Sequence, residues 1–413
     1  MMTIITNDLG HGMGNAWENK DWAHISDPEL QSLQQHYSCL QGHFEILWYS
    51  PRPFSSAALV KVEQDFVIRD EAVAHQYLIK RSHCSFRRAR DILQEHAVLQ
   101  HLASKEIPVA ALISSNQGLT ALELGDWTYE VYAKAAGLDL YANQQSWKPF
   151  FYAEHAAKAG QLLARLHMAM QDFPEQQGRS ASYLVSNQQL LDSENIITAI
   201  QRRIANSSEL SRYFADKNLD PYFLDRILQV HQRIQPVLQQ ASKIWTHNDL
   251  HASNLFWSAP DAKAEITAVI DFGLSDRNSA LYDLAVTIER NFIDWLELEQ
   301  SPHIQIDEAG LTAFLHAYFS KVHPQEDFSI LPELLKIVHL DFAFSELEYF
   351  VGITHNLNHA DAAYYDWIIG HVDWFFGEQG QQFIQTLTRL IQRELHASQL
   401  LSLNPASSPI SKT

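Results

Sequence analysis

Three side chains near the middle of the chain have the types and spacing that phosphoryl transfer requires. Asp249 precedes Asn254 by five positions in a polar loop between two short apolar runs, and Asp271 follows a third apolar run. Phosphoryl transfer needs a carboxylate that orients the acceptor hydroxyl, and oxygen ligands that hold Mg²⁺ on the nucleotide phosphates. Asp249 fits the catalytic base, while Asn254 and Asp271 fit the metal ligands. The pattern predicts an enzyme that uses ATP and Mg²⁺.

Two other interpretations of this loop start from the same residues. Polar loops often contain Asp, Asn and His without a catalytic role. Against this, an Asp-Phe-Gly turn begins 17 residues after Asn254, behind a second apolar run, and the combination is more specific than either motif alone. His247 and His251 also have the H-x-x-x-H spacing of helical zinc sites. No helix-forming run surrounds them and no Glu follows His247, so zinc is not expected.

Composition and charge narrow the classes of function. The chain has 413 residues, only two cysteines and no apolar run of the ~18 residues that a membrane helix needs. Its start lacks the basic and apolar regions of a signal peptide. These features predict a cytoplasmic protein that does not enter membranes. A formal net charge of −19 argues against nucleic-acid binding. It suits a cationic small substrate, or it serves solubility alone.

The order of sequence patterns predicts an α+β protein with two lobes. Residues 1–42 read as an N-terminal extension, with a short helix that begins at Ser26-Asp27-Pro28-Glu29. Residues 43–135 contain strand-like runs and one amphipathic helix, which predicts a small antiparallel lobe that binds the nucleotide. Residues 136–398 are mainly helical in pattern and are expected to bind the acceptor. Residues 399–413 read as a flexible, Ser/Pro-rich tail.

Four residues of the predicted small lobe could serve the nucleotide. Lys80 ends a strand-like run and Glu95 lies in the middle of the following helix, an order that permits an ion pair holding the lysine on phosphates. The alternative is two solvated charges. Ser55 and Ser56 lie in a predicted tight connection between strands, where hydroxyl and N–H groups could bind phosphate. An ordinary hairpin turn explains them equally well.

With these residues in view, the sequence resembles the aminoglycoside phosphotransferase/choline kinase family, a branch of the protein-kinase-like fold. The resemblance covers about residues 44–395. It implies a small N-terminal antiparallel β-sheet lobe with one helix and a larger, mainly helical C-terminal lobe. In that family's pattern Lys80 is the strand lysine, Glu95 the helix glutamate, Asp249 the base, and Asn254 and Asp271 the metal ligands.

The resemblance also implies roles for the segment that joins the lobes. Gly137 matches the glycine just after the hinge, which makes the backbones of Ala133 and Ala135 the expected adenine contacts. Asp283 matches an aspartate that is expected to be structural. Asn248 departs from the pattern because it stands where the family has glycine. Asn tolerates unusual φ values, so the turn is expected to persist, and Asn248 could contact the substrate.

The leading hypothesis is therefore a phosphotransferase that acts on a hydroxyl of a small molecule. A protein kinase is the second possibility, but only 11 residues separate Asp271 from Asp283, which leaves little room for a peptide-binding activation segment. A non-catalytic nucleotide-binding pseudokinase would require the loss of a key residue type, and all five are present. The oligomeric state is not indicated by the sequence.

The acceptor itself is predicted from one aromatic, acidic helix. In the segment 339–350, Asp341 and Glu348 are seven positions apart and share a helix face, with aromatic residues nearby. Carboxylates beside aromatic rings suit an amine or quaternary ammonium group, which predicts an amino-alcohol or amino-sugar. The alternative is that the aromatic residues form core and the acids are solvated.

Overall fold

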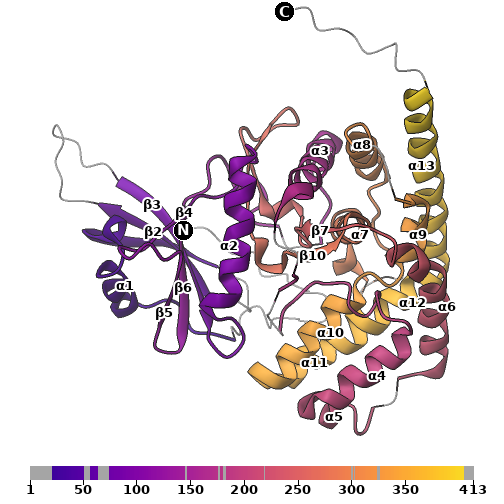
Figure 1. Cartoon of the computed structure of the whole chain (residues 1–413), viewed down its shortest axis with the longest axis horizontal. Coiled ribbons are helices and arrows are strands. Elements are labelled where there is room, and N and C mark those ends of the chain that lie inside the picture. The colour runs from indigo at the N-terminus through magenta and orange to yellow at the C-terminus, as the bar shows by residue number, and fades with distance from the viewer. Residues whose placement is uncertain are drawn as a thin grey trace, which may run out of the picture.

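The computed structural model describes residues 21–50, 56–63, 74–144, 147–174, 177–179, 183–217, 219–298, 301, 303–322 and 326–403. These residues form a small lobe with most of the strands and a larger, helical lobe, as Figure 1 shows. The strand β6 ends at Ala133, and Leu138 already pairs with Trp257 of the large lobe. The predicted α+β architecture with two lobes is confirmed.

The small lobe is built on one antiparallel sheet. Its strand order is β1-β2-β3-β6-β4, and β5 pairs with β6 as well. In β2 the side chains of Ala58, Val60 and Val62 alternate toward the core, as expected for a sheet with one buried face. The strands are β1 (His43–Tyr49), β2 (Ser56–Glu63), β3 (Ala74–His83), β4 (Leu112–Ile113), β5 (Ala121–Leu124) and β6 (Trp127–Ala133).

The N-terminal residues that the structure describes belong to this small lobe. The helix α1 (Asp27–Gln34) begins with a capping box at Ser26, as its sequence predicted. Its apolar side chains join the core beneath the sheet, and Glu29 pairs with Arg81 of β3. The prediction of a separate extension is therefore wrong for residues 21–42, because their apolar residues cover a sheet face. Residues 1–20 lie outside the described part of the chain.

The helix α2 (Ala89–Ser104) stands between the sheet and the large lobe in Figure 1. It buries Ile92, Leu99 and Leu102 at helical spacing, as its pattern predicted. The same face carries Glu95, which is nearly inaccessible to solvent. This position directs an acidic side chain toward the junction of the lobes.

Helices make up most of the large lobe. The long α3 packs against α8, and at Gly160 a Cβ atom would lie 2.3 Å from the carbonyl oxygen of Phe314. The absence of a side chain at Gly160 therefore allows the two helices to pack closely. The helices are α3 (Ala153–Ala169), α4 (Ile196–Asn206), α5 (Ser208–Tyr213), α6 (Pro221–Leu238), α7 (Ala280–Phe292), α8 (Glu308–Phe319), α9 (Leu331–Leu335), α10 (Leu340–Tyr349), α11 (Leu357–Ala362), α12 (His371–Phe376) and α13 (Glu378–Leu403).

Two small antiparallel sheets support the polar loops. The strand β7 (Lys243–Thr246) pairs with β10 (Asp276–Ser279), and β8 (Leu255–Trp257) pairs with β9 (Ile266–Val269). Because each pair joins the two sides of both loops, residues 247–254 and 270–275 must lie next to each other. The sequence motif with Asp249 is thereby brought to Asp271.

The C-terminal boundary differs from the expected one. The last helix α13 continues to Leu403, so the predicted start of a flexible tail at residue 399 falls inside a helix. Residues 404–413 lie outside the described part of the chain. None of the described helices has both the length and the apolar character that a bilayer crossing requires.

Candidate active site

The loop that carries Asp249 is anchored by the helix α7. The carboxylate of Asp283 is fully buried and accepts hydrogen bonds from the backbone N–H groups of His247 and Asn248, at 2.9 and 2.8 Å. Burial opposes its charge, but the hydrogen bond and charge of His167 keep the pKa of Asp283 below its usual value. Asn291, two turns further along α7, binds the carbonyl of Leu250 at 2.7 Å. These contacts fix the loop backbone.

Asn248 has a structural role in this loop. It adopts a left-handed φ of 61°, which Asn tolerates better than most residues. Its amide nitrogen donates to the carbonyls of Ser186 and Leu274, and its oxygen accepts from Thr246. Because the side chain is fully buried and engaged at both ends, the prediction that Asn248 contacts the substrate is wrong. The prediction that the turn persists is confirmed.

Asp249 lies beside Arg290, which lines the pocket described below. Its Oδ1 lies 2.9 Å from Nη1 of Arg290, and about one seventh of its side chain, 14%, is exposed. The amide of Asn254 donates to the Asp249 carbonyl at 2.8 Å, so the predicted base and the predicted metal ligand share one turn. An exposed carboxylate edge beside a fixed cation can accept a hydroxyl proton while remaining oriented.

Asp271 and Lys80 form the second half of the site. Asp271 follows β9 with a left-handed φ of 61°, a conformation that costs energy for a residue with a side chain and clusters at functional sites. Lys80, on β3, donates to Oδ1 of Asp271 at 2.8 Å. Burial would raise the pKa of Asp271, but Lys80 and Arg87 outweigh it and hold that pKa well below its usual range. The group is an ionised carboxylate at neutral pH.

The donor set fits a divalent cation of the Mg²⁺ type. Such ions take one or two carboxylates from the protein and complete their shell with water and phosphate oxygens. Asp271 supplies the carboxylate. Asn254 uses only its amide nitrogen in hydrogen bonds to described residues, which leaves its oxygen for a metal. Within the described residues, no three His, Cys, Asp or Glu side chains gather as a metal site.

The predicted Lys80–Glu95 ion pair is not formed. Glu95 pairs instead with Arg87 and, at 3.6 Å, with Arg179. The acid nearest to Lys80 in strand register is Glu130, directly opposite on β6 and also buried. Burial opposes ionisation of Glu130, but His96, Arg87 and Lys80 lower its pKa to about 2. The order of residues in the sequence could not reveal that two arginines would compete for Glu95.

Two of the groups expected to contact the nucleotide, at the hinge and in the serine turn, already have hydrogen-bond partners within the protein. The N–H of Ala133 already donates to the carbonyl of Ala111 at 2.9 Å, so it is not available to adenine. Ala135 lies beyond the strand, and its N–H has no hydrogen bond to any described residue. Ser56 donates its hydroxyl to the carbonyl of Ala23 at 3.1 Å and is buried, which corrects its predicted phosphate contact. Ser55 lies outside the described residues.

Glycine at position 137 has a steric reason. Its φ is 99°, and a Cβ atom there would lie 2.1 Å from Oγ1 of Thr267 and 2.7 Å from the carbonyl of Trp257. No side chain fits in that space. The chain therefore turns tightly against the large lobe directly after the hinge.

The two acids predicted to bind the acceptor have other partners. Asp341 is fully buried and accepts hydrogen bonds from the N–H groups of Leu190 and Leu191, at 2.8 and 3.4 Å. Glu348 forms a two-pronged ion pair with Arg203, with both distances 2.8 Å. Neither carboxylate is available to a substrate, so both assignments are wrong. Their shared helix face packs onto the segment 190–203 rather than onto the active site.

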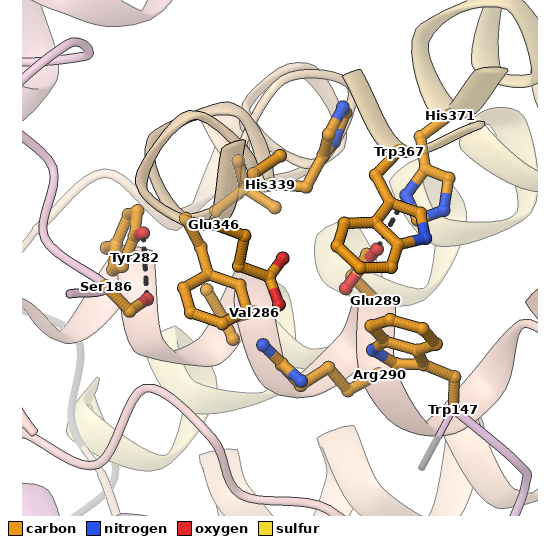
Figure 2. A pocket seen from close by; sticks show the side chains of 13 residues that line it. Trp147, Ser186, Tyr282, Val286, Glu289, Arg290, His339, Glu346, Trp367 and His371 are labelled. Carbon is orange, nitrogen blue, oxygen red and sulfur yellow. Dashed lines mark hydrogen bonds and ion pairs between the residues drawn. The ribbon is translucent and has the colours of Figure 1, made fainter. Parts of the chain in front are cut away.

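The opposite face of α10 lines a pocket next to Asp249. Glu346 is rotated by about 140° from Asp341 at 100° per residue, and it points into the pocket beside Arg290, as Figure 2 shows. Its side chain is 3% exposed, yet it makes no hydrogen bond or ion pair with any described residue. Burial and the charges of Asp249 and Glu289, only partly offset by Arg290, raise the pKa of Glu346 well above its usual value.

The pocket has aromatic and basic walls. The guanidinium of Arg290 lies 5.2 Å from the ring of Phe342 and 5.8 Å from that of Trp147, and Trp367 closes another side. Nδ1 of His371 lies 2.9 Å from Oε1 of Glu289, but burial lowers the pKa of His371 to about 3, so this imidazole is neutral. As it stands the cavity is narrow, about 30 Å³, which is room for about two waters.

Sequence reasoning missed Arg290, Asn291 and Glu346, and a signal existed for the first two. Polar residues recur in the apolar helix α7 at Asp283, Thr287, Arg290 and Asn291. This spacing of four, then three and four, places them on one face. Asp283 and Asn291 at its two ends bind the backbone of residues 247–250, so this face of α7 meets the loop. For Glu346, helix periodicity separated it from Asp341 but could not tell which face meets the site.

A comparison with models of protein families identifies the family of this chain. The model of the phosphotransferase enzyme family matches residues 60–324, which is more than half of the chain. The chain belongs to the phosphotransferase enzyme family. The matched segment includes Lys80, Asp249, Asn254 and Asp271. No curated protein sequence matches the chain significantly.

Solved structures of this phosphotransferase's fold include two antibiotic kinases. Amicoumacin kinase, determined with AMP-PNP and Ca²⁺, has 14% sequence identity and a TM-score of 0.51, over 83% of this chain and 95% of that one. Spectinomycin phosphotransferase, determined with ADP and its substrate, has 13% identity and a TM-score of 0.50, over 89% and 100% of the two chains. At identities this low, the structural similarity establishes the fold alone. It confirms the predicted protein-kinase-like architecture.

Proposed function

We propose that this phosphotransferase moves the γ-phosphoryl group of ATP to a hydroxyl of a small molecule with the help of Mg²⁺. The observation that carries the proposal is the convergence of Asp249, Asn254, Asp271 and Lys80 at the junction of the lobes, with an aromatic pocket beside Asp249. Both named antibiotic kinases act on small molecules by their names, which supports the same acceptor class here.

The proposed roles follow from the positions. Asp249 accepts the proton of the acceptor hydroxyl, and Arg290 keeps the carboxylate oriented toward the pocket. Asp271 and Asn254 hold Mg²⁺, which neutralises charge on the phosphates when bound. Lys80 exchanges its partner Asp271 for the α- and β-phosphates once the metal takes up that carboxylate. The N–H of Ala135 is the adenine contact.

A protein substrate is a weaker candidate. The whole stretch between Asp271 and Asp283 is used by the short helix Phe272–Leu274, the strand β10 and the start of α7. No part of it is left to form a platform for an extended peptide. A pseudokinase is disfavoured by the intact set of ionic residues.

For the acceptor we propose a cationic compound, an amino-alcohol or amino-sugar, with Glu346 in place of Asp341 and Glu348. A buried carboxyl without a partner destabilises the empty protein, whereas an ammonium group would satisfy it. Phe342, Trp147 and Trp367 supply rings that attract cations. Glu289 adds a second negative group, although the neutral His371 already lies against it.

A binding titration followed by an activity screen tests the function. The melting temperature should rise with MgATP, and phosphate transfer should appear with at least one hydroxyl compound in a panel of amine-bearing, neutral and anionic metabolites. Asp249→Asn serves as the inactive control, since it should keep the thermal shift and lose transfer. Transfer to a protein substrate but to no small molecule would contradict the proposal.

A further inference from the structure

Two arginines from different lobes meet at the same two acceptors. Arg87, just before α2, and Arg179, from the segment between α3 and α4, both pair with Glu95. Both guanidinium groups also donate to the carbonyl of Gly273 in the Asp-Phe-Gly turn. Arg179 is held further by Ser275 and by Asp276, whose carboxylate accepts the Arg179 backbone N–H at 2.8 Å. Glu95 therefore has one partner more than its charge requires.

One end of Arg87 has no partner and lies beside the metal carboxylate. The hydrogen bonds of its guanidinium to described residues all use Nη2, so the N–H groups of Nη1 are left to donate. A Cβ atom placed on Gly273 would lie 3.1 Å from Nη1 of Arg87 and 3.1 Å from Oδ1 of Asp271. Because both distances start from the same point, Nη1 of Arg87 and Oδ1 of Asp271 are at most about 6.2 Å apart. About a fifth of the Arg87 side chain, 20%, is exposed, against 2% for Arg179.

The charges at this site favour an incoming anion. Burial opposes the charge of Arg87, but Glu95, Glu130 and Asp271 raise its pKa, so the guanidinium stays positive. A metal ion on Asp271 would remove one of these negative neighbours. Because metal ions in phosphotransferases bridge the β- and γ-phosphates, a phosphoryl group brought to Asp271 arrives next to the open end of Arg87.

We propose that Arg87 is a catalytic residue that binds the γ-phosphate of the nucleotide, while Arg179 holds Glu95 in its place. This inference rests on the proposed function. Arg87 exchanges one carboxylate for phosphate oxygens, and Arg179, already 3.6 Å from the same oxygen of Glu95, keeps α2 attached to the turn. Arg179 is a positioning residue, since its contacts are all within the protein.

The transfer step balances without a proton from Arg87. The acceptor oxygen forms a bond to the γ-phosphorus and loses its proton to Asp249. The bond from that phosphorus to the bridging oxygen breaks, and its electron pair leaves with ADP. Arg87 supplies positive charge and hydrogen bonds to the non-bridging oxygens, which carry the charge of the transition state.

The test compares nucleotides that differ in the γ-phosphate. Affinities for AMP-PNP and ADP, both with Mg²⁺, are measured by calorimetry for the wild type, Arg87→Gln, Arg179→Gln and the exposed control Arg90→Gln on the same helix. Arg87→Gln should weaken AMP-PNP binding about tenfold to a hundredfold relative to ADP, the size expected for a hydrogen bond to a charged group. Arg90→Gln should leave both affinities unchanged.

Arg179→Gln separates positioning from contact. Its loss should change the two affinities by the same factor, because Arg179 does not reach the nucleotide. Arg87→Lys should recover part of the preference for AMP-PNP, since it restores the positive charge. An unchanged ratio of the two affinities in a folded Arg87→Gln variant, judged by its melting temperature, would overturn the inference while leaving the proposed function intact. A wild type that binds neither nucleotide would remove both.

Discussion

The two sides of the active site treat their buried charges in opposite ways. On the nucleotide side each ionised group has a partner: Lys80 with Asp271, Glu95 with two arginines, and Glu130 with His96. On the acceptor side, Asp249 is paired with Arg290, but Glu346 has no partner among the described residues. The nucleotide must therefore exchange existing ion pairs, whereas an acceptor amine would form a new one.

This difference indicates which side contributes to the stability of the free protein and which side selects a ligand. A cluster of ion pairs holds the two lobes together before any ligand binds. Its cations can exchange carboxylate partners for phosphate oxygens with little change in net charge. A buried, unpaired carboxyl is costly in the free protein, so its presence in a pocket is more informative about a ligand than a satisfied ion pair is. The following changes test the two sides in turn.

The largest effect is expected from Asp249→Asn. Turnover should fall about 10²–10⁴-fold, because a positioned base contributes that much, while MgATP affinity stays near the wild-type value. Calorimetry and steady-state kinetics on the same preparation provide both numbers. Near-normal turnover with the physiological acceptor would show that another group is the base.

On the nucleotide side, Asp271→Ala should weaken MgATP binding by tenfold or more, since it removes a charged metal ligand and the partner of Lys80. The affinity for ATP measured with EDTA should change much less. Asp276→Asn is a matched control, because that carboxylate accepts the backbone N–H groups of Arg179 and Arg277. Equal MgATP affinity for wild type and Asp271→Ala would place the metal elsewhere.

On the acceptor side, Glu346→Gln should raise KM for an amine acceptor about 2- to 30-fold, the range of a cation–π and ion-pair contact, without changing MgATP affinity. In the wild type this KM should fall as pH rises, because the carboxyl with a raised pKa must lose its proton to attract a cation. Arg290, Glu289, Asp249, His339 and His371 also face this pocket or its edge.

That pH dependence has its own control. A neutral acceptor analogue should show no such trend in KM, and Glu348→Gln should behave as the wild type because its partner is Arg203. The hydroxyl acceptor would not be a cation if Glu346→Gln and wild type had the same KM profile.

The smallest effect concerns stability. Burial raises the pKa of Asp341 to about 7 despite two backbone hydrogen bonds. Between the unfolded value near 4 and this folded value, the unfolded chain gives up the proton first, so this group makes stability fall as pH rises. The slope is at most about 1.4 kcal/mol per pH unit. Asp341→Asn should flatten it in denaturant titrations from pH 4 to 8, and an unchanged slope would contradict the assignment.

The sequence by itself determined the catalytic loop, because its elements are local. The spacing of Asp249 and Asn254 fits one turn, Asn248 could take the left-handed conformation, and the amphipathic pattern of α2 placed Glu95 in the middle of a helix. Strand-like and helical periodicity also predicted a strand-rich lobe followed by a mainly helical one. Such features depend only on residues a few positions apart, so they can be predicted from the sequence.

Only the tertiary structure decided which distant charges meet. Glu95 pairs with Arg87 and Arg179 instead of Lys80. Asp341 accepts hydrogen bonds from the N–H groups of residues 190–191, and Glu348 pairs with Arg203. Each partner lies on a separate segment, and a long side chain can satisfy any acid within its reach. Helix periodicity gives the angle between Asp341 and Glu346, but packing alone sets which of the two faces the pocket.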